Sequence, residues 1–275
     1  MSNSKKLFIF GLGYSSQYIA KLAMEAGFEV YGTCRTQEKC NQLEAQSIKA
    51  FLFDGVPPDV LAGASHILSS IPPQEGEDIA LPLLPDTTGK WLGYLSTTGV
   101  YGDWKGEWVD ETSEVRPNNK RLKARVAAEK GWLDCGGHVF RLAGIYGPGR
   151  NAIENVRAGT ARRIDKPGQV FSRIHVEDIA QTVLASMLNP SPGAIYNVCD
   201  DEPAPAHEVI SYACELLKVS APPLVPINEV NLSQMGKEFY QSNRRVRNQR
   251  IKEELRVDLG YPTYREGLRS FVSLA

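Results

Sequence analysis

The sequence has little that would place the protein in a membrane or on a nucleic acid. In its 275 residues, no stretch approaches ~18 consecutive apolar residues, the length that a membrane-spanning helix requires. The apolar run at 7–12 is short and no small-residue cleavage site follows it, so we expect no signal peptide. The formal net charge of −1 gives no electrostatic reason to expect a nucleic acid or a membrane surface as partner.

Ordered cysteine and histidine patterns are also missing. The five cysteines and four histidines are dispersed and form neither a CxxC pair nor a metal-ligand spacing. We therefore predict no metal site. An odd, scattered set of cysteines is typical of reduced, buried thiols, and we expect a cytoplasmic protein. The sequence does not decide between a monomer and a homodimer.

What the sequence does have is a glycine turn between an apolar run and a helix. Residues 5–10 suit a strand that is buried on both faces. Gly11 and Gly13 permit a tight turn and the close approach of a ligand to the backbone. After Ser15, apolar residues recur at helical spacing until Gly27. A helix that starts after such a turn presents free N–H groups and a positive dipole end to a pyrophosphate.

This unit predicts a dinucleotide site. The residues that we expect to contact the cofactor here are Gly11, Gly13, Tyr14, Ser15 and Ser16. Ser16 stands where the Gly-x-Gly-x-x-Gly fingerprint has its third glycine, which weakens the motif without excluding the site. The alternative is a glycine-rich turn in an ordinary α/β protein.

The end of the second expected strand favours NADP over NAD. A site for NAD commonly has Asp or Glu here, whereas this strand ends in Arg35 and the next carboxylate is Glu38. A guanidinium can bind the 2′-phosphate with two hydrogen bonds. The alternative is that Arg35 is a solvated surface residue.

Further along the chain, apolar strand-like runs alternate with helical patterns. This order predicts an α/β fold with a doubly wound parallel sheet and a small C-terminal lobe. We expect a Rossmann domain over 1–200 and the lobe over 201–275, with 146–170 contributing to the lobe. The expected helices are 36–46, 77–85, 120–134, 176–188 and 206–218, and the expected strands are 48–53, 64–71, 91–96, 138–142 and 194–199.

Ligands of such sheets lie beyond the carboxyl ends of the strands. Asp54, Ser70, Pro72 and Thr97 all fall at expected strand ends. We therefore predict that they line the ligand site.

Four segments in the same order resemble the extended short-chain dehydrogenase/reductases, the NAD(P)-dependent epimerase/dehydratase superfamily. They are the glycine-rich unit and residues 96–102 (STTGVYG), 140–149 (FRLAGIYGPG) and 173–180 (RIHVEDIA). The resemblance covers nearly the whole chain. It implies a Rossmann domain that binds a nicotinamide cofactor and a C-terminal lobe that binds substrate, often a nucleotide sugar.

The resemblance also implies roles for single residues. Thr97 takes the place of the hydroxyl that orients the substrate oxygen, and Asp54 that of a residue that accepts from the adenine amino group. Glu129 fits the Glu that follows the Tyr-x-x-x-Lys pair, which puts Arg121 at the Tyr position and Arg125 at the Lys position. Because arginine does not deprotonate in proteins, Arg121 cannot act as the acid/base. Arg125 can still bind a ribose or phosphate.

The substituted pair resembles the atypical, YeeZ-like group, which keeps the cofactor fold without Tyr and Lys. The proton would then come from Tyr101, from Tyr146 or from water, although a packed aromatic side chain is the alternative for both tyrosines. The basic run from Arg244 to Lys252 is interpreted as a solvated helix face, and the alternative is that it binds a phosphate-bearing substrate.

Two functions remain open. The first is an NADP-linked oxidoreductase or epimerase/dehydratase that acts on a small carbonyl or nucleotide-sugar-like substrate. The second is an inactive NADP(H)-binding sensor or scaffold, which the loss of the Tyr/Lys pair favours.

Overall fold

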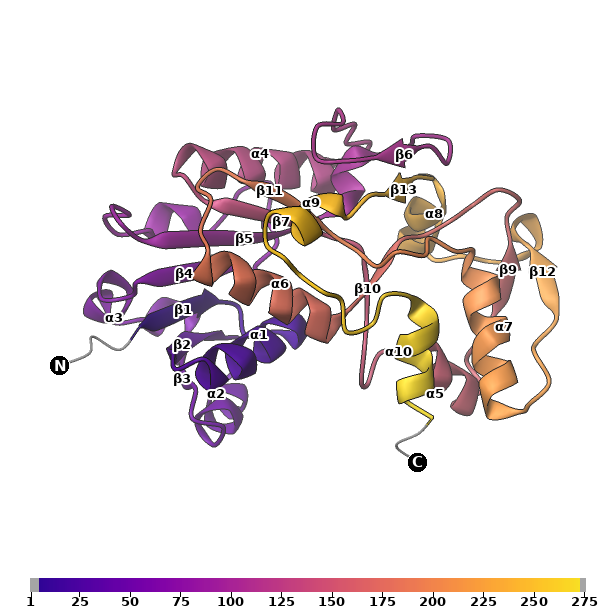
Figure 1. The fold of residues 1–275 in the computed structure, drawn as a ribbon, viewed down its shortest axis with the longest axis horizontal. Coiled ribbons are helices and arrows are strands. Elements are labelled where there is room, and N and C mark those ends of the chain that lie inside the picture. Colours follow the sequence, from indigo (N-terminus) through magenta and orange to yellow (C-terminus); the bar gives the residue numbers. More distant parts are fainter. Residues whose placement is uncertain (1–4, 273–275) are drawn as a thin grey trace.

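A seven-stranded parallel sheet forms the centre of the protein (Figure 1). The computed structural model describes residues 5–272. The strand order is β11-β7-β5-β4-β1-β2-β3, which places the reversal of strand order between β1 and β4. In chain order the strands are β1 (Lys6–Phe10), β2 (Glu29–Cys34), β3 (Lys49–Leu52), β4 (His66–Ser69), β5 (Trp91–Thr97), β7 (His138–Leu142) and β11 (Ile195–Val198).

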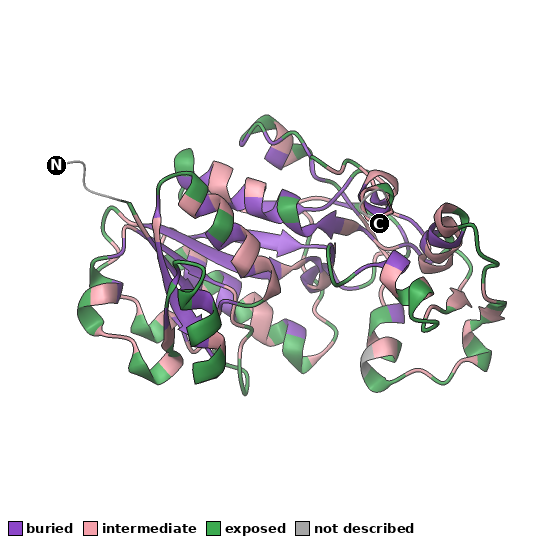
Figure 2. Ribbon diagram, turned by 90° about the horizontal axis from the view of Figure 1, so that it is seen from below, coloured by how far each residue is buried: buried purple, intermediate pink, exposed green. Residues whose placement is uncertain are grey.

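Helices cover both faces of this sheet, so the predicted doubly wound fold is confirmed. One face carries α1 (Tyr14–Glu25), α2 (Gln37–Glu44) and α6 (Val176–Leu188), which enclose the larger core. The other face carries α3 (Pro58–Ala62) and α4 (Lys120–Asp134), around a second core that includes Trp132. Figure 2 shows the strands as the buried centre and the outer faces of the helices as exposed.

A smaller lobe lies beyond the carboxyl ends of the strands. Its core is formed by α5 (Ala152–Arg157), α7 (Ala206–Leu217) and α10 (Tyr264–Ser270), with Ile153 and Leu268 among the buried side chains. The remaining short strands and helices are β6 (Trp108–Val109), β8 (Gly144–Tyr146), β9 (Arg163–Asp165), β10 (Arg173–His175), β12 (Leu224–Pro226), β13 (Arg245–Val246), α8 (Gln234–Tyr240), α9 (Gln249–Glu253) and the 3₁₀ turns η1 (Phe53–Gly55), η2 (Leu81–Leu83), η3 (Thr98–Tyr101) and η4 (Ile227–Glu229).

The chain returns from the lobe to the larger core before it ends. Val246, Ile251 and Leu259 pack in the same cluster as Leu7 and Val198. Backbone N–H groups of Gly260 and Tyr261 donate to the Asp178 carboxylate of α6. The domain boundary at residue 200 stays a prediction, and this returning segment shows that both halves of the chain build the larger core.

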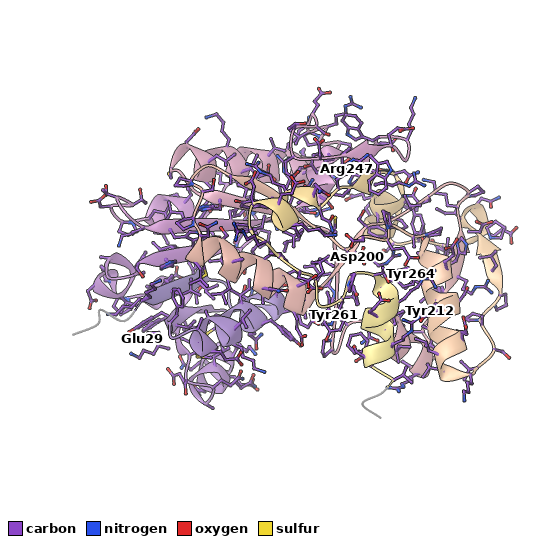
Figure 3. All side chains as sticks on the ribbon, viewed as in Figure 1. Glu29, Asp200, Tyr212, Arg247, Tyr261 and Tyr264 are labelled. Atoms are coloured by element: carbon purple, nitrogen blue, oxygen red, sulfur yellow. A yellow bond between two sulfur atoms is a disulfide. The ribbon has the colours of Figure 1, made fainter. Side chains whose placement is uncertain are left out.

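Buried polar residues mark the junction between sheet and lobe (Figure 3). Asp200 follows β11 and is 1% exposed, and Tyr264 of α10 is also buried. Burial raises the pKa of the Asp200 carboxyl well above its usual range, although Arg173 opposes the shift.

Some expectations on local structure are wrong. Residues 77–85 contain only the 3₁₀ turn η2 instead of a longer helix, and α3 was not expected. The expectation that all cysteines are reduced, buried thiols is also wrong. Cys34 and Cys40 form a disulfide, and the free Cys135 is exposed. No helix within residues 5–272 is long and apolar enough to cross a membrane.

Candidate active site

A cavity of ≈ 590 Å³ lies at the carboxyl ends of the strands. The segments after β1, β4, β5 and β7 line one side, and residues of the lobe line the other. This is the position beside the reversal of strand order where open α/β sheets bind ligands, and the volume lies in the range of small-molecule sites.

The glycine turn after β1 is held open by short hydrogen bonds. Gly11 has a φ of +86°, and a Cβ there would lie 2.9 Å from Ser70 Oγ. Its N–H donates to Thr33 Oγ1 at 2.8 Å, and Ser70 Oγ donates to its carbonyl at 2.5 Å. Gly11 therefore shapes the turn from behind the cavity wall, whereas Gly13 lines the cavity itself.

The N-terminus of α1 points unpaired donors at this cavity. Gly13 caps the helix without a side-chain hydrogen bond, and a Cβ on it would meet nothing within 4 Å. Within residues 5–272, the backbone N–H groups of Tyr14, Ser15 and Ser16 have no acceptor. Ser16 is 1% exposed, and its Oγ is buried without a partner. A pyrophosphate would satisfy these donors, so the residues present fit a dinucleotide.

Not all predicted cofactor residues line the cavity. Those that do are Gly13, Tyr14, Ser15, Ser16, Ser70 and Arg125. Arg35, Asp54 and Pro72 are exposed residues that follow β2, β3 and β4 at the same sheet edge. Their contacts with a cofactor stay predictions.

Thr97 is the last residue of β5 and lines the cavity. Its Oγ1 accepts from the backbone N–H of Gly99 at 3.1 Å, which starts η3. Because that bond uses only an oxygen lone pair, the hydroxyl proton remains available to a ligand.

Arg121 and Arg125 both line the cavity from α4, and their surroundings differ. Arg125 Nη1 donates to Leu95 O at 2.8 Å and to Tyr94 Oη at 2.9 Å, so strand β5 fixes the guanidinium. Arg121 is exposed and makes no hydrogen bond or ion pair to the part of the chain that the structure describes. It is therefore available to a ligand.

The two tyrosines that were considered as proton donors lie outside the cavity lining. Tyr101 is fully buried and donates to Asn197 Oδ1 at 2.8 Å. Burial raises its pKa to about 12, which disfavours proton exchange near neutral pH. Tyr146 is 8% exposed, packs edge-to-face on His175, and has a pKa that burial raises still further. Both match the packed-aromatic alternative.

Tyr14 is the tyrosine that lines the cavity among the described residues. Its hydroxyl donates to Pro148 O at 2.8 Å, and burial raises its pKa. The Arg150 guanidinium lies 6.0 Å from its ring. Tyr14 therefore contributes a wall of the site rather than a readily exchanged proton.

Arg244 is a site residue that the sequence analysis named only as part of a basic run. The structure places it before β13, and it lines the cavity, so the interpretation of this run as a solvated helix face is wrong here. Its Nη1 donates to Gly102 O at 2.9 Å, while its Nε is buried without an acceptor. Burial lowers the pKa of Arg244 to about 10, so the guanidinium stays charged at neutral pH.

Asn243 holds Arg244 in position. Its backbone N–H donates to Asp103 Oδ1 at 2.8 Å, and its Nδ2 donates to Gly168 O at 2.8 Å. Its Oδ1 accepts from the N–H of Val170 at 3.1 Å. Two loops far apart in the sequence are thereby joined beside the cavity.

An aromatic pair borders the lobe side of the cavity. Phe171 and Phe239 are stacked with ring centroids 4.2 Å apart, and Phe239 is 54% exposed. An exposed ring beside cationic side chains can pack on the flat part of a ligand.

Comparisons with known proteins agree with this fold. No family model matches the sequence. A conserved protein of unknown function from Silicibacter pomeroyi DSS has a solved structure that is 45% identical, with 98% of each chain covered and a TM-score of 0.89. Protein YeeZ of Escherichia coli (strain K12) is 27% identical over 226 residues, which cover 74% of this chain and 79% of YeeZ.

More distant structures share the fold alone. The dTDP-glucose 4,6-dehydratase of Bacillus anthracis in complex with NAD has a TM-score of 0.76 at 15% identity, with 98% of this chain and 96% of the dehydratase covered. The UDP-N-acetylglucosamine 4-epimerase of Bacillus cereus has a TM-score of 0.72 at 13% identity, with 98% of this chain and 99% of the epimerase covered.

Proposed function

We propose that this protein, an extended short-chain dehydrogenase/reductase of the YeeZ-like type, binds NADP(H) and acts on a small carbonyl or nucleotide-sugar-like substrate. The resemblance inferred from the four sequence segments is confirmed by the similarity to YeeZ and by the epimerase/dehydratase fold. In the proposed reaction, the bound nicotinamide supplies or accepts a hydride. The protein's residues bind and orient the substrate.

The observation that carries cofactor binding is the unsatisfied N-terminus of α1. Three N–H groups and the buried Ser16 Oγ lack protein acceptors beside a cavity wall that is open at Gly13. A buried hydroxyl without a partner costs about 1–3 kcal/mol, and an anionic ligand at this place removes that cost. The dehydratase of the same fold is described in complex with NAD.

The preference for NADP rests on Arg35. This residue is exposed immediately after β2 and has no ion pair among residues 5–272. The 2′-phosphate of NADP would lie at the end of β2 in the dinucleotide position of this fold, where a guanidinium can donate two hydrogen bonds. No carboxylate stands in its place to bind a free 2′-hydroxyl.

The substrate is proposed to carry an anionic group. Among the described residues, four arginines line the cavity, namely Arg121, Arg125, Arg150 and Arg244, against the single carboxylate of Glu238. Arg150 lies beside Tyr14 at the cofactor end, whereas Arg244 reaches the cavity from the lobe. A phosphate or carboxylate on the substrate would pair with Arg244 and Arg121. The epimerases and dehydratases of this fold act on nucleotide sugars, as their names state.

Thr97 is proposed to polarise the reacting oxygen. Its hydroxyl proton is unused at the end of β5, and a hydrogen bond from it would stabilise the oxygen as charge develops. Arg125, fixed by β5, is proposed to bind the cofactor ribose or a phosphate in place of the family's lysine. Tyr101 is not retained as the proton donor, because its hydroxyl is engaged away from the cavity. Water is the remaining donor.

One observation favours the second function, a non-catalytic NADP(H)-binding sensor or scaffold. Neither Tyr101 nor Tyr146 lines the cavity, and the Tyr14 hydroxyl donates its hydrogen bond to the backbone carbonyl of Pro148. A site without a positioned acid/base loses about 10²–10⁴-fold of rate. Binding would then remain while turnover is lost.

The test separates binding from turnover. NADPH and NADH are titrated against the protein by nicotinamide fluorescence, and absorbance is then followed with a panel of carbonyl compounds and nucleotide sugars. We expect NADPH to bind more tightly and at least one anionic substrate to be turned over. Binding without turnover across the panel supports the sensor, and no binding of either nucleotide overturns both functions.

Arg35→Ala tests the choice of cofactor. Hydrogen bonds to charged groups contribute about 1.5–3 kcal/mol, so NADPH affinity should fall about 10- to 100-fold while NADH affinity stays the same. Arg157→Ala is the matched control, because Arg157 is exposed on α5 and does not line the cavity. An unchanged NADPH/NADH affinity ratio in Arg35→Ala would contradict the assignment.

A further inference from the structure

The Cys34–Cys40 disulfide lies at the cofactor edge of the sheet. Cys34 is the last residue of β2, Cys40 belongs to α2, and their Cα atoms are 5.9 Å apart. Both side chains are buried. The other three cysteines are unpaired. The bond therefore joins the end of β2 to α2, the helix that follows it; Figure 1 labels both elements.

The loop that this disulfide closes contains the proposed 2′-phosphate residue. Arg35 follows Cys34 directly, and Thr36 then caps α2 by accepting from the N–H of Lys39 at 3.3 Å. With both ends of the loop tied, the backbone at Arg35 has few conformations available. The Arg35 guanidinium therefore extends from a backbone that is held in place.

The residue before Cys34 holds the glycine turn. Thr33 O accepts from the N–H of Leu12 at 2.8 Å, and Thr33 Oγ1 accepts from the N–H of Gly11 at 2.8 Å. The disulfide thus lies next to both Thr33 and Arg35. Thr33 holds the glycine turn after β1, and Arg35 is the proposed 2′-phosphate residue.

The residue before Cys40 is tied to the same turn from the other side. Lys39 Nζ donates to Gln17 Oε1 at 3.0 Å, and Gln17 Nε2 donates to Gly13 O at 3.0 Å. Both anchors of the disulfide are therefore one residue away from groups that hold the turn between β1 and α1.

We infer that Cys34 and Cys40 form a reversible dithiol–disulfide modification site that sets the affinity for NADP(H). The inference rests on the proposed function, because it needs a dinucleotide at this edge. Formation of the bond requires a small-molecule disulfide as oxidant. One cysteine thiolate attacks it and releases one thiol, and the second cysteine then displaces the other thiol. The protein loses two protons and two electrons, and the oxidant is reduced to two thiols.

The oxidised protein binds NADPH more tightly than the reduced one. Reduction removes the covalent tie between the end of β2 and α2, so the backbone at Arg35 then has to be ordered when the 2′-phosphate binds. Ordering costs of this kind should lower the NADPH affinity about three- to tenfold. NADH lacks the phosphate that Arg35 binds, so its affinity should change less, and the NADPH/NADH ratio reports on the loop.

The experiment compares the unmodified protein before and after treatment with dithiothreitol. Alkylation under denaturing conditions, read by mass spectrometry, should label three cysteines in the oxidised protein and all five after reduction. NADPH and NADH dissociation constants are measured for both forms. Equal NADPH affinity in two forms with verified thiol counts overturns the inference and leaves the proposed function intact. Absence of binding in both forms overturns the proposed function and the inference together.

Two variants complete the test. The double variant Cys34→Ser, Cys40→Ser should bind NADPH like the reduced protein and should not respond to dithiothreitol. The matched control is Cys135→Ser, which removes an exposed unpaired cysteine and should keep the full response. A response that follows Cys135 instead would also overturn the inference. Chemical reduction of the unmodified chain decides the question if the double variant does not fold.

Discussion

Arg141 of β7 binds the Glu129 carboxylate of α4 with its Nε at 3.2 Å from both oxygens and its Nη2 at 2.7 Å from Oε2. Their side chains are 6% and 3% exposed. Ser96 of β5 also donates to Glu129, at 2.5 Å, and Arg141 Nη1 donates to Tyr101 Oη. This buried pair fixes α4, with Arg121 and Arg125, against the strand that ends in Thr97.

Removing one partner of this pair should destabilise the fold strongly. We expect Arg141→Met to lower the free energy of unfolding by about 3–5 kcal/mol, because it leaves the Glu129 charge buried without its partner. Urea denaturation measures the change. Lys130→Ala is the control, since the exposed pair of Lys130 and Asp134 on the same helix contributes about 0.3–0.5 kcal/mol. Equal effects of both variants would contradict the assignment of a strong buried pair.

The two glycines of the turn should respond differently to alanine. Gly11→Ala places a Cβ 2.9 Å from Ser70 Oγ at a φ of +86°, so we expect a loss of about 1–2 kcal/mol of unfolding free energy. Gly13→Ala meets nothing within 4 Å and should leave stability unchanged while it blocks the dinucleotide. Thermal unfolding and NADPH titration separate the two effects. Full NADPH binding by Gly13→Ala would argue against a cofactor at this turn.

Substitution of Thr97 should affect turnover, whereas substitution of Tyr101 should affect stability. Thr97→Val removes the hydroxyl at the cavity and should reduce turnover about 10²-fold, whereas Thr97→Ser should retain it. Tyr101→Phe removes the bonds to Asn197 and Arg141, so it should cost about 1–3 kcal/mol of stability with turnover preserved. Steady-state kinetics on the substrate found in the panel gives the comparison. Loss of turnover in a folded Tyr101→Phe protein would restore Tyr101 as the proton donor.

His175 should make stability depend on pH. Burial lowers its pKa from 6.5 to about 4, so the folded state disfavours the protonated ring. The stability contributed by neutral His175 is fully present above pH 6.5 and is lost as the pH falls towards 4. In His175→Asn, which keeps an acceptor for the N–H of Glu177, the unfolding free energy should fall less over this interval. Parallel pH profiles of the two proteins would refute the role of His175.

Much of the fold could be predicted because local signals and tertiary packing agree. The helices expected at 120–134 and 176–188 match α4 and α6, whose N-caps Asn119 and His175 accept from backbone N–H groups. The spacing of Leu122, Val126 and Leu133 predicts a buried face of α4 that the structure confirms only at Leu122. Val126 and Leu133 are only half-buried, whereas Ala128 and Trp132 face the core, because helical spacing admits several neighbouring stripes.

The site was predictable only in part, for a similar reason. Residues at strand ends, such as Thr97 and Ser70, meet at one edge because the strands are parallel. Arg244 reaches the cavity only because Asn243 joins two distant loops, which no local pattern encodes. The Cys34–Cys40 bond was missed because a separation of six residues does not determine whether two thiols meet.

The return of the chain to its first core has a consequence for biosynthesis. Leu259 packs in the same cluster as Leu7, and Asn248 Nδ2 donates to Cys199 O at 2.8 Å. Contacts between positions so distant in sequence form slowly, since a long loop has to close before they stabilise anything. During synthesis, the larger core around the central sheet therefore cannot close until residues 246–259 have been added, long after the first strands of the sheet.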